Sequence, residues 1–148
     1  MIRPDFRPAD CRFYPGQPGY ELTNDFSFIV ASGSARTIPA GFWFNGASIP
    51  AAFWQITFSP FDPRIIDGAL IHDWLYTSKQ VPRKVADNTF AAFLLANSHA
   101  GIRTEVVRYA VRMFGGLAWL DSKRDREYLT SLKQMIRQRG APLSRYGL

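Results

Sequence analysis

Cysteine is almost absent from this sequence, which has only Cys11 among its 148 residues. A single cysteine excludes an intramolecular disulfide and argues against a cysteine-based metal site. Long apolar runs are also missing, because no stretch approaches the roughly 20 residues that span a bilayer. The first five residues show no apolar signal-peptide core. We therefore expect a protein without a transmembrane segment, made and folded in a reducing cytoplasm.

The short motifs that bind common cofactors are missing as well. No zinc-ligand spacing, phosphate-binding glycine loop or dinucleotide-binding glycine run occurs. The composition, at 47% hydrophobic and 15% aromatic residues, excludes a disordered chain. A chain of 148 residues is long enough for one sizeable core. We predict a single domain over residues 1–148.

The formal net charge of +6 is concentrated at one end of the chain. Residues 1–98 contain eight basic and eight acidic side chains, whereas residues 99–148 contain ten basic and four acidic ones. A basic face can serve nucleic acid or an acidic protein. Here acidic residues are interspersed among the basic ones on a predicted amphipathic helix, which favours a solvated helix face. We expect no specific nucleic-acid partner.

We interpret residues 1–60, which hold seven of the ten prolines, as a layer rich in strands and loops. Alternation through Phe26, Phe28 and Val30 predicts a strand over residues 20–31. Residues 32–34, Ser-Gly-Ser, predict a turn, and residues 35–38 a short partner strand that Pro39 ends. No repeat or linker separates this layer from the rest of the chain.

From residue 63 to 140 the pattern is helical. Apolar residues at helical spacing predict a helix over 64–78, and Pro82 begins a second one that ends near Gly101. Thr104 can cap a third helix, which Gly115 ends. A fourth runs from residue 121 or 122 to Gly140. We predict an α+β fold, with a small β-rich N-terminal region packed on a bundle of about four helices.

The first chemical candidate is the run Ile71-His72-Asp73-Trp74-Leu75-Tyr76. Helical spacing stacks His72 and Tyr76 one turn apart and turns Asp73 by about 100° toward the next face. A returning antiparallel helix would bring Asp87 to His72. A carboxylate there can orient an imidazole and stabilise its cation, as in hydrolytic triads. Equally, these four side chains can form a buried hydrogen-bonded network that ties the two helices together.

The second candidate is the segment of residues 39–50, in which Asn45-Gly46 suits a turn with positive φ. Gly46-Ala47 allows close approach of another backbone, a water or a cation, and Ser48 can cap a short turn. Ser48 lacks the small-residue elbow of a serine nucleophile. We therefore interpret Gly41, Asn45, Gly46 and Ser48 as a structural loop.

Three ordered motifs resemble a phage-associated family, the domain of unknown function numbered 1353. They are Gly41-Phe42 with residues 45–50, then His72-Asp73-Trp74-Leu75-Tyr76, then Arg83 with Ala86-Asp87 and Phe90. The resemblance covers about residues 38–115 and implies a protein of tailed bacteriophages or prophages. That family commonly has an aspartate where this chain has Asn45, so the loop is not expected to supply a charged metal ligand.

The same helix pair is similar to the catalytic helices of secreted phospholipase A2. By that resemblance His72 would activate water, Asp73 would hold calcium, Asp87 would orient His72, and Tyr76 would bond to Asp87. Carbonyls around residues 43–46 would complete the calcium site. The disulfide framework and the glycine-rich calcium loop of that family are not matched here. No cofactor is therefore expected, and calcium is the alternative.

Two classes of function stay open. The sequence favours a structural or accessory subunit of a phage tail region, bound to other virion proteins in an oligomeric assembly. Its docking surfaces would draw on aromatic and basic residues near the two ends: Phe6, Phe13, Tyr14 and Tyr20, or Arg137, Arg139 and Tyr146. The alternative is a small phospholipase-like or other hydrolase that acts on the host envelope, with His72 as general base and Asp87 and Tyr76 as its partners.

Overall fold

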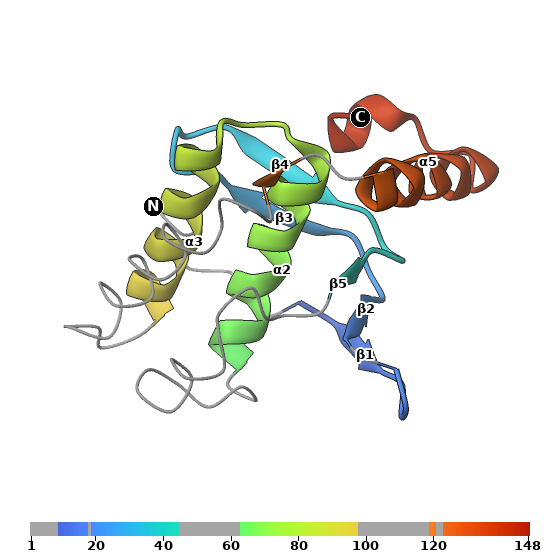
Figure 1. The fold of residues 1–148 in the computed structure, drawn as a ribbon. Helices are drawn as coiled ribbons and strands as arrows, with labels where there is room; N and C mark the ends of the chain where they lie inside the picture. The colour runs from blue at the N-terminus through green and yellow to red at the C-terminus, as the bar shows by residue number, and fades with distance from the viewer. Residues whose placement is uncertain (1–8, 18, 45–62, 98–118, 121–122) are drawn as a thin grey trace.

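The computed structural model of the chain describes residues 9–17, 19–44, 63–97, 119–120 and 123–148. Along this part, five short strands precede three helices and a terminal 3-10 turn (Figure 1). The strands and helices are β1 (Cys11–Phe13), β2 (Tyr20–Leu22), β3 (Phe26–Ile29), β4 (Ala35–Ile38), β5 (Trp43–Phe44), α2 (Pro63–Ser78), α3 (Arg83–Asn97), α5 (Lys123–Gln138) and η1 (Leu143–Tyr146). The predicted α+β class is confirmed.

Strands β3 and β4 form an antiparallel hairpin with Phe26 opposite Ile38. Phe26 and Phe28 point into the core while the alternate residues of β3 are exposed, as the period-two pattern predicts. The predicted turn closes the hairpin, with Gly33 at φ 91° and its N–H donating to the carbonyl of Val30. Both the turn and the partner strand are confirmed.

The prediction of one strand over residues 20–31 is wrong, because the segment supplies two strands to different sheets. β2 lies between β1 and β5 in an antiparallel three-stranded sheet. The chain then turns at residues 23–25, where the N–H of Thr23 donates to the carbonyl of Asp10. Oδ1 of Asp25 accepts the N–H of Ala40 at 2.9 Å. These bonds redirect the chain into the β3–β4 hairpin.

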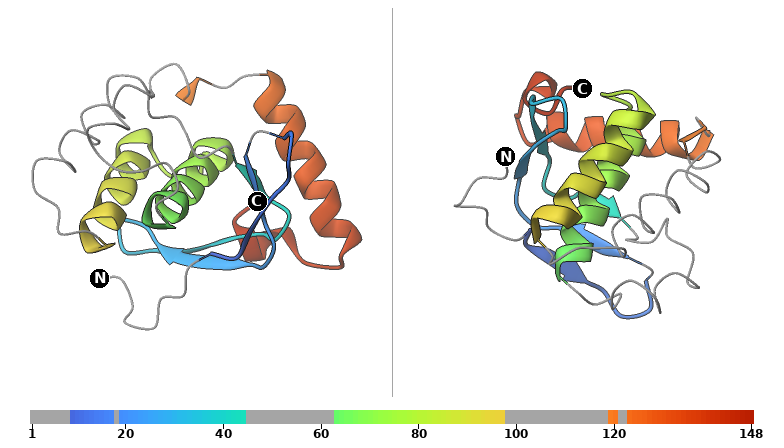
Figure 2. Two further views of the ribbon diagram at one scale, coloured as in Figure 1. Left: turned by 90° about the horizontal axis from the view of Figure 1, so that it is seen from below. Right: turned by 90° about the vertical axis from the view of Figure 1, so that its left-hand side faces the viewer.

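Helices α2 and α3 lie side by side, with α5 on the other side of α2 from α3 (Figures 1 and 2). α2 begins one residue before the predicted range of 64–78, and Pro82 precedes α3 as expected. The predicted end of the second helix near Gly101 lies outside the described residues. On α2, Leu70, Trp74 and Leu75 are fully buried. The predicted third helix, from Thr104 to Gly115, lies outside the described residues.

Helix α5 packs an apolar stripe against the strands. Leu132 and Ile136 are buried, and Met135 is partly buried against the same core. The hydroxyl of Tyr128 accepts the N–H of Trp43 at 2.7 Å, which fastens the helix to β5. Residues of both layers, from Leu22 to Ile136, therefore contribute to one hydrophobic core. No helix in the described ranges is long and apolar enough to cross a membrane.

Candidate functional site

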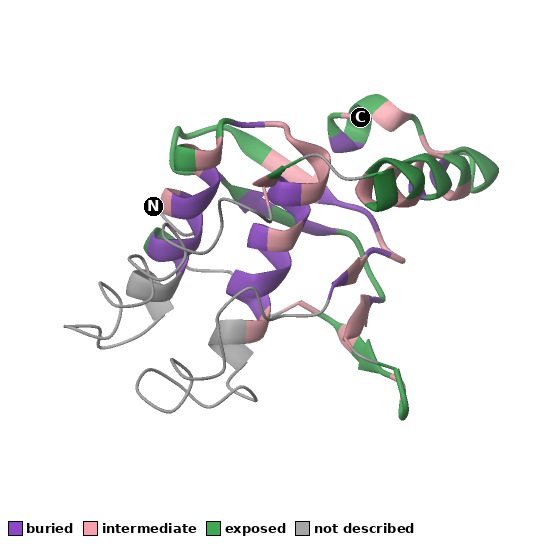
Figure 3. Cartoon of the chain, viewed as in Figure 1, coloured by how far each residue is buried: buried purple, intermediate pink, exposed green. Residues whose placement is uncertain are grey.

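His72 lies between the two packed helices, with only 3% of its surface exposed. Helical spacing on α2 places the ring of Tyr76 4.0 Å from the imidazole, centroid to centroid. Phe90 of α3 packs on it at 5.2 Å. The buried stretches of α2 and α3 are purple in Figure 3. The imidazole is therefore held in one orientation by aromatic packing.

Asp87 is the hub of this group and is itself only 4% exposed. Its Oδ1 accepts a 2.6 Å hydrogen bond from the hydroxyl of Tyr76 and lies 3.5 Å from Nε2 of His72. Its Oδ2 lies 3.5 Å from Nε of Arg83, one turn earlier on α3. The predicted meeting of His72, Tyr76 and Asp87 is present in the structure. We call these three residues the His72 centre.

The charge state of His72 reflects two opposed effects. Burial lowers the pKa of His72, but the nearby carboxylates of Asp73 and Asp87 outweigh this effect and leave the pKa above 6.5. Burial and then the Asp87 carboxylate raise the pKa of Tyr76 far above its ordinary range. Tyr76 therefore stays protonated and serves as a donor, and His72 titrates above its usual range.

The two nitrogens of His72 face different carboxylates. Nε2 faces the buried Asp87, whereas Nδ1 lies 3.9 Å from Oδ1 of Asp73. The side chain of Asp73 is 16% exposed, so this side of the ring is nearer to solvent. An imidazole held through Nε2 can accept a proton at Nδ1. In the described part of the chain, no group of three or more His, Cys, Asp or Glu residues could hold a metal.

Two neighbours of the His72 centre, Arg83 and Trp119, were not predicted from the sequence as site residues. Arg83 belongs to one of the motifs, and its spacing of four from Asp87 is typical of an ion pair on one helix. The ring of Trp119 packs edge-on against Tyr76 at 4.9 Å. The ammonium group of Lys79 lies 3.9 Å above the Trp119 ring. No periodicity links Trp119 to Tyr76, since the two positions are 43 apart in sequence.

Only part of the second candidate falls within the described residues. Asn45, Gly46 and Ser48 lie outside them, as does Phe6. Gly41 has φ 86°, and a Cβ at this position would stand 2.9 Å from Cε of Met135. Its structural role is therefore to let α5 approach the β4–β5 connection.

The proposed docking residues differ in exposure. Phe13 is 58% exposed on β1, and Arg137 and Arg139 are exposed at the end of α5. Tyr14 and Tyr20 are partly buried, because each packs on an aromatic residue of β5. Tyr146, the remaining residue of the predicted docking surfaces, is buried within this chain. Its side chain is only 5% exposed and its hydroxyl bonds to Asp25, since η1 packs against β4.

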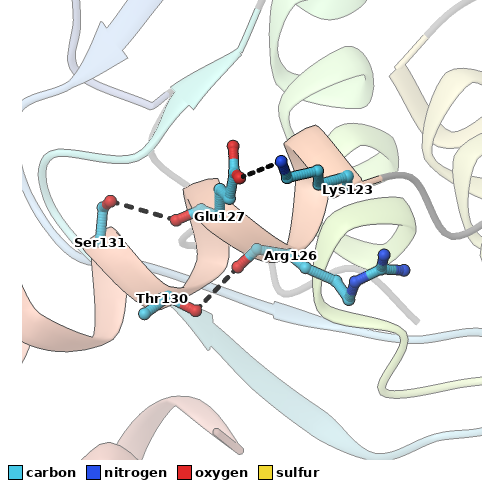
Figure 4. Close-up of a pocket in the computed structure, with 5 residues that line it drawn as sticks. All are labelled: Lys123, Arg126, Glu127, Thr130 and Ser131. Atoms are coloured by element: carbon cyan, nitrogen blue, oxygen red, sulfur yellow. Dashed lines mark hydrogen bonds and ion pairs between the residues drawn. The ribbon is translucent and has the colours of Figure 1, made fainter.

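Two further places in the described residues hold reactive or polar side chains, at Cys11 and along α5. Burial, and then the charges of Asp67 and Asp10, raise the pKa of Cys11 to about 12, which keeps the thiol protonated. An open hollow along α5 is lined by polar side chains (Figure 4). There the hydroxyls of Thr130 and Ser131 donate to carbonyls of their own helix, and Lys123 pairs with Glu127 at 3.6 Å. These groups do not form a catalytic arrangement.

Comparison with known proteins gives a family and one relative. The family model described as "Protein of unknown function (DUF1353)" matches residues 20–111. The uncharacterized protein y4jT of Sinorhizobium fredii is 31% identical over 107 residues, which cover 72% of this chain and 32% of that protein. This chain thus spans about a third of the length of that relative. No solved structure shows significant similarity to this chain.

Proposed function

This chain belongs to the DUF1353 family, and we propose that it is a small phage or prophage hydrolase in which His72 activates water. One observation carries the proposal. Oδ1 of Asp87 is fixed by the Tyr76 hydroxyl at 2.6 Å and faces Nε2 of His72 at 3.5 Å. A carboxylate placed in this way selects the tautomer that bears its proton on Nε2 and leaves Nδ1 as the base.

The 3.5 Å distance between Nε2 of His72 and Oδ1 of Asp87 favours a catalytic role for His72 over a role in a purely structural network. A structural network gains most when every buried polar atom is hydrogen-bonded. Nε2 of His72 has no hydrogen-bond partner in the described ranges, because 3.5 Å is long for such a bond. Catalytic hydrogen bonds are often long without substrate and shorten in the reacting complex.

The proposed step is the hydrolysis of an ester in a lipid or another envelope component. A water near Nδ1 and Asp73 loses its proton to His72 as its oxygen attacks the ester carbonyl. Asp87 stabilises the imidazolium that forms, and Tyr76 holds Asp87 in place. His72 then returns the proton to the leaving alkoxide, so the products are an acid and an alcohol.

Release of fatty acid from phospholipid vesicles tests this proposal. Wild type should release fatty acid, and the rate should rise with pH as His72 loses its proton, with a midpoint above 6.5. His72→Asn should abolish release and leave a cooperative thermal transition. Arg124→Gln, which changes an exposed side chain of α5, is the matched control and should retain the rate.

Two results would contradict hydrolysis at the His72 centre. One is wild-type protein that releases no acid from vesicles or from isolated host envelopes at any pH. The other is release that persists in His72→Asn.

The second candidate is a structural or accessory subunit of the phage tail region, bound to other virion proteins in an oligomer. It is favoured by the 58% exposure of Phe13, since a large exposed aromatic side chain is typical of an interface centre. Quantitative blotting of purified particles should then find the protein at a fixed ratio to the major tail protein. Phe13→Ser should fold normally but enter particles less efficiently. Normal assembly and infection by particles without the protein would exclude this role.

A further inference from the structure

A hollow with a volume of about 550 Å³ lies away from the His72 centre, between β4, the α2–α3 turn and η1. It is lined by Arg36 and Thr37 of β4, by Gln80, and by Ser144, Arg145 and Tyr146 of η1. β4 packs against η1, and both can be followed in Figure 1. Its size falls within the range of about 300–1,000 Å³ that small-molecule sites occupy. We call it the arginine hollow.

The charged side chains among the described lining residues of the arginine hollow are both positive. Two arginine residues, Arg36 and Arg145, line it, and no acidic side chain is among its described lining residues. The carboxylate near it, that of Asp25, is already engaged. Its Oδ1 accepts the N–H of Ala40, and its Oδ2 accepts the Tyr146 hydroxyl at 3.1 Å and lies 3.2 Å from Nη2 of Arg145. Asp25 thus positions Arg145 without lining the hollow.

Local contacts fix one wall of the hollow. The side-chain amide of Gln80 donates a 2.5 Å hydrogen bond to the carbonyl of Tyr146, which ties the α2–α3 turn to η1. Gly147 has φ 69°, and a Cβ there would stand 3.0 Å from Nε2 of Gln80. A larger residue at 147 would therefore press on this contact. Preorganised walls of this kind lower the cost of ligand binding.

We propose that the arginine hollow binds an organic phosphate. Guanidinium groups match phosphate and carboxylate oxygens with two parallel hydrogen bonds. A carboxylate has two oxygens and satisfies one such fork, whereas a phosphate dianion has oxygens and charge enough for both Arg36 and Arg145. Ser144 is an exposed residue on the lining, and its hydroxyl can serve as a further donor. The volume leaves room for the organic group that carries the phosphate.

The phosphate can belong to a free metabolite or to a lipid headgroup, and two probes separate these sources. Isothermal titration with glycerol 3-phosphate at fixed ionic strength tests the soluble form. Flotation with phosphatidylcholine vesicles, with and without phosphatidic acid, tests the lipid form. We expect saturable binding of glycerol 3-phosphate, at a dissociation constant that rises about tenfold in Arg36→Gln. Binding only to vesicles that contain phosphatidic acid, with the same sensitivity, assigns the phosphate to a lipid.

Two further variants keep the test decisive. Arg145→Gln should weaken binding by a similar factor, and its thermal transition shows whether losing the Asp25 contact has changed the fold. Arg124→Gln removes an exposed arginine of α5 that does not line the hollow, so it should bind like wild type. Absence of saturable binding to both probes would overturn the proposal. Equal weakening by Arg124→Gln and Arg36→Gln would also overturn it, because binding would then follow net charge.

Discussion

The hydroxyl of Tyr76 donates a 2.6 Å hydrogen bond to Oδ1 of Asp87, the same oxygen that faces His72. Tyr76 and His72 therefore compete for one carboxylate oxygen. While Tyr76 stabilises the Asp87 anion, Asp87 stabilises the His72 cation less than it otherwise would. This arrangement links the proton affinity of His72 to a side chain one helical turn away.

Tyr76→Phe tests that link. The variant removes one buried hydrogen bond to a carboxylate, so the free energy of unfolding should fall by about 1–3 kcal/mol. The pKa of His72 should rise further, because Asp87 loses its tyrosine donor. Chemical denaturation measures the first effect, and titration of the His72 ring by nuclear magnetic resonance measures the second.

Tyr128→Phe is the matched control for this prediction. Its hydroxyl accepts the N–H of Trp43 at 2.7 Å, so its loss should also lower stability. It has no contact with Asp87 in the described structure and should leave the titration of His72 unchanged. An unchanged His72 titration in Tyr76→Phe would show that Tyr76 does not tune this histidine.

Gly41→Ala should destabilise the protein for two separable reasons. At φ 86° an alanine is strained by about 1–2 kcal/mol, and its Cβ would stand 2.9 Å from the end of the Met135 side chain. Gly33→Ala is the control, because Gly33 has φ 91° with nothing within 4 Å of its Cβ position. Denaturation should show a loss in both variants and a larger loss at Gly41. In a Met135→Ala background, the difference between the stability losses of Gly41→Ala and Gly33→Ala should shrink. Equal losses for the two variants with Met135 present would exclude a contribution from the Met135 contact.

The helical part of the fold was predictable because its information is local. The meeting of His72, Tyr76 and Asp87 depends on a period of 3.6 and on the short connection at Pro82, which forces an antiparallel return. The hairpin at residues 26–38 depends on alternation and a glycine turn. In these places neighbouring residues determine the geometry.

Contacts between distant residues were not predictable in the same way. The division of residues 20–31 depends on β1 and β5, strands of three and two residues with too little pattern to detect. Tyr146 contacts Asp25 over 121 positions in sequence, and Trp119 contacts Tyr76 over 43 positions. Such pairs depend on how the layers pack, which a single sequence does not encode in any local period.

Calcium should have no effect on this protein. A calcium site needs about six to eight oxygen ligands, and among the described residues around His72 only Asp73 offers a partly exposed carboxylate beside the ring. The raised pKa of His72 also places a competing cation near that carboxylate. We expect no heat in calorimetry at millimolar calcium and no shift in melting temperature. A saturable signal that disappears in Asp73→Asn but survives in Glu127→Gln would contradict this prediction and support the phospholipase-like site.

The last prediction concerns Asp67, a buried carboxylate of α2. Its Oδ1 accepts the N–H of Ala9 at 3.0 Å, and only 5% of the residue is exposed. Burial raises the pKa of Asp67 from 3.8 to about 6, although the bond from Ala9 opposes this shift. The folded state therefore holds this proton more tightly than the unfolded state does. Protonated Asp67 therefore makes its full contribution to the free energy of unfolding below pH 3.8. This contribution is lost as the pH rises through 6.

Asp67→Asn should consequently be more stable than wild type at neutral pH. The amide oxygen can still accept the Ala9 N–H, and no charge has to be buried. The shift corresponds to about 1.4 kcal/mol per pKa unit at most, so we expect a gain of about 1–2 kcal/mol at pH 7 that vanishes near pH 4. Urea denaturation across this range measures the gain, and Glu127→Gln, which removes an exposed carboxylate, corrects for the change in net charge. A variant less stable than wild type at pH 7 would show that the charged form of Asp67 has a stabilising partner.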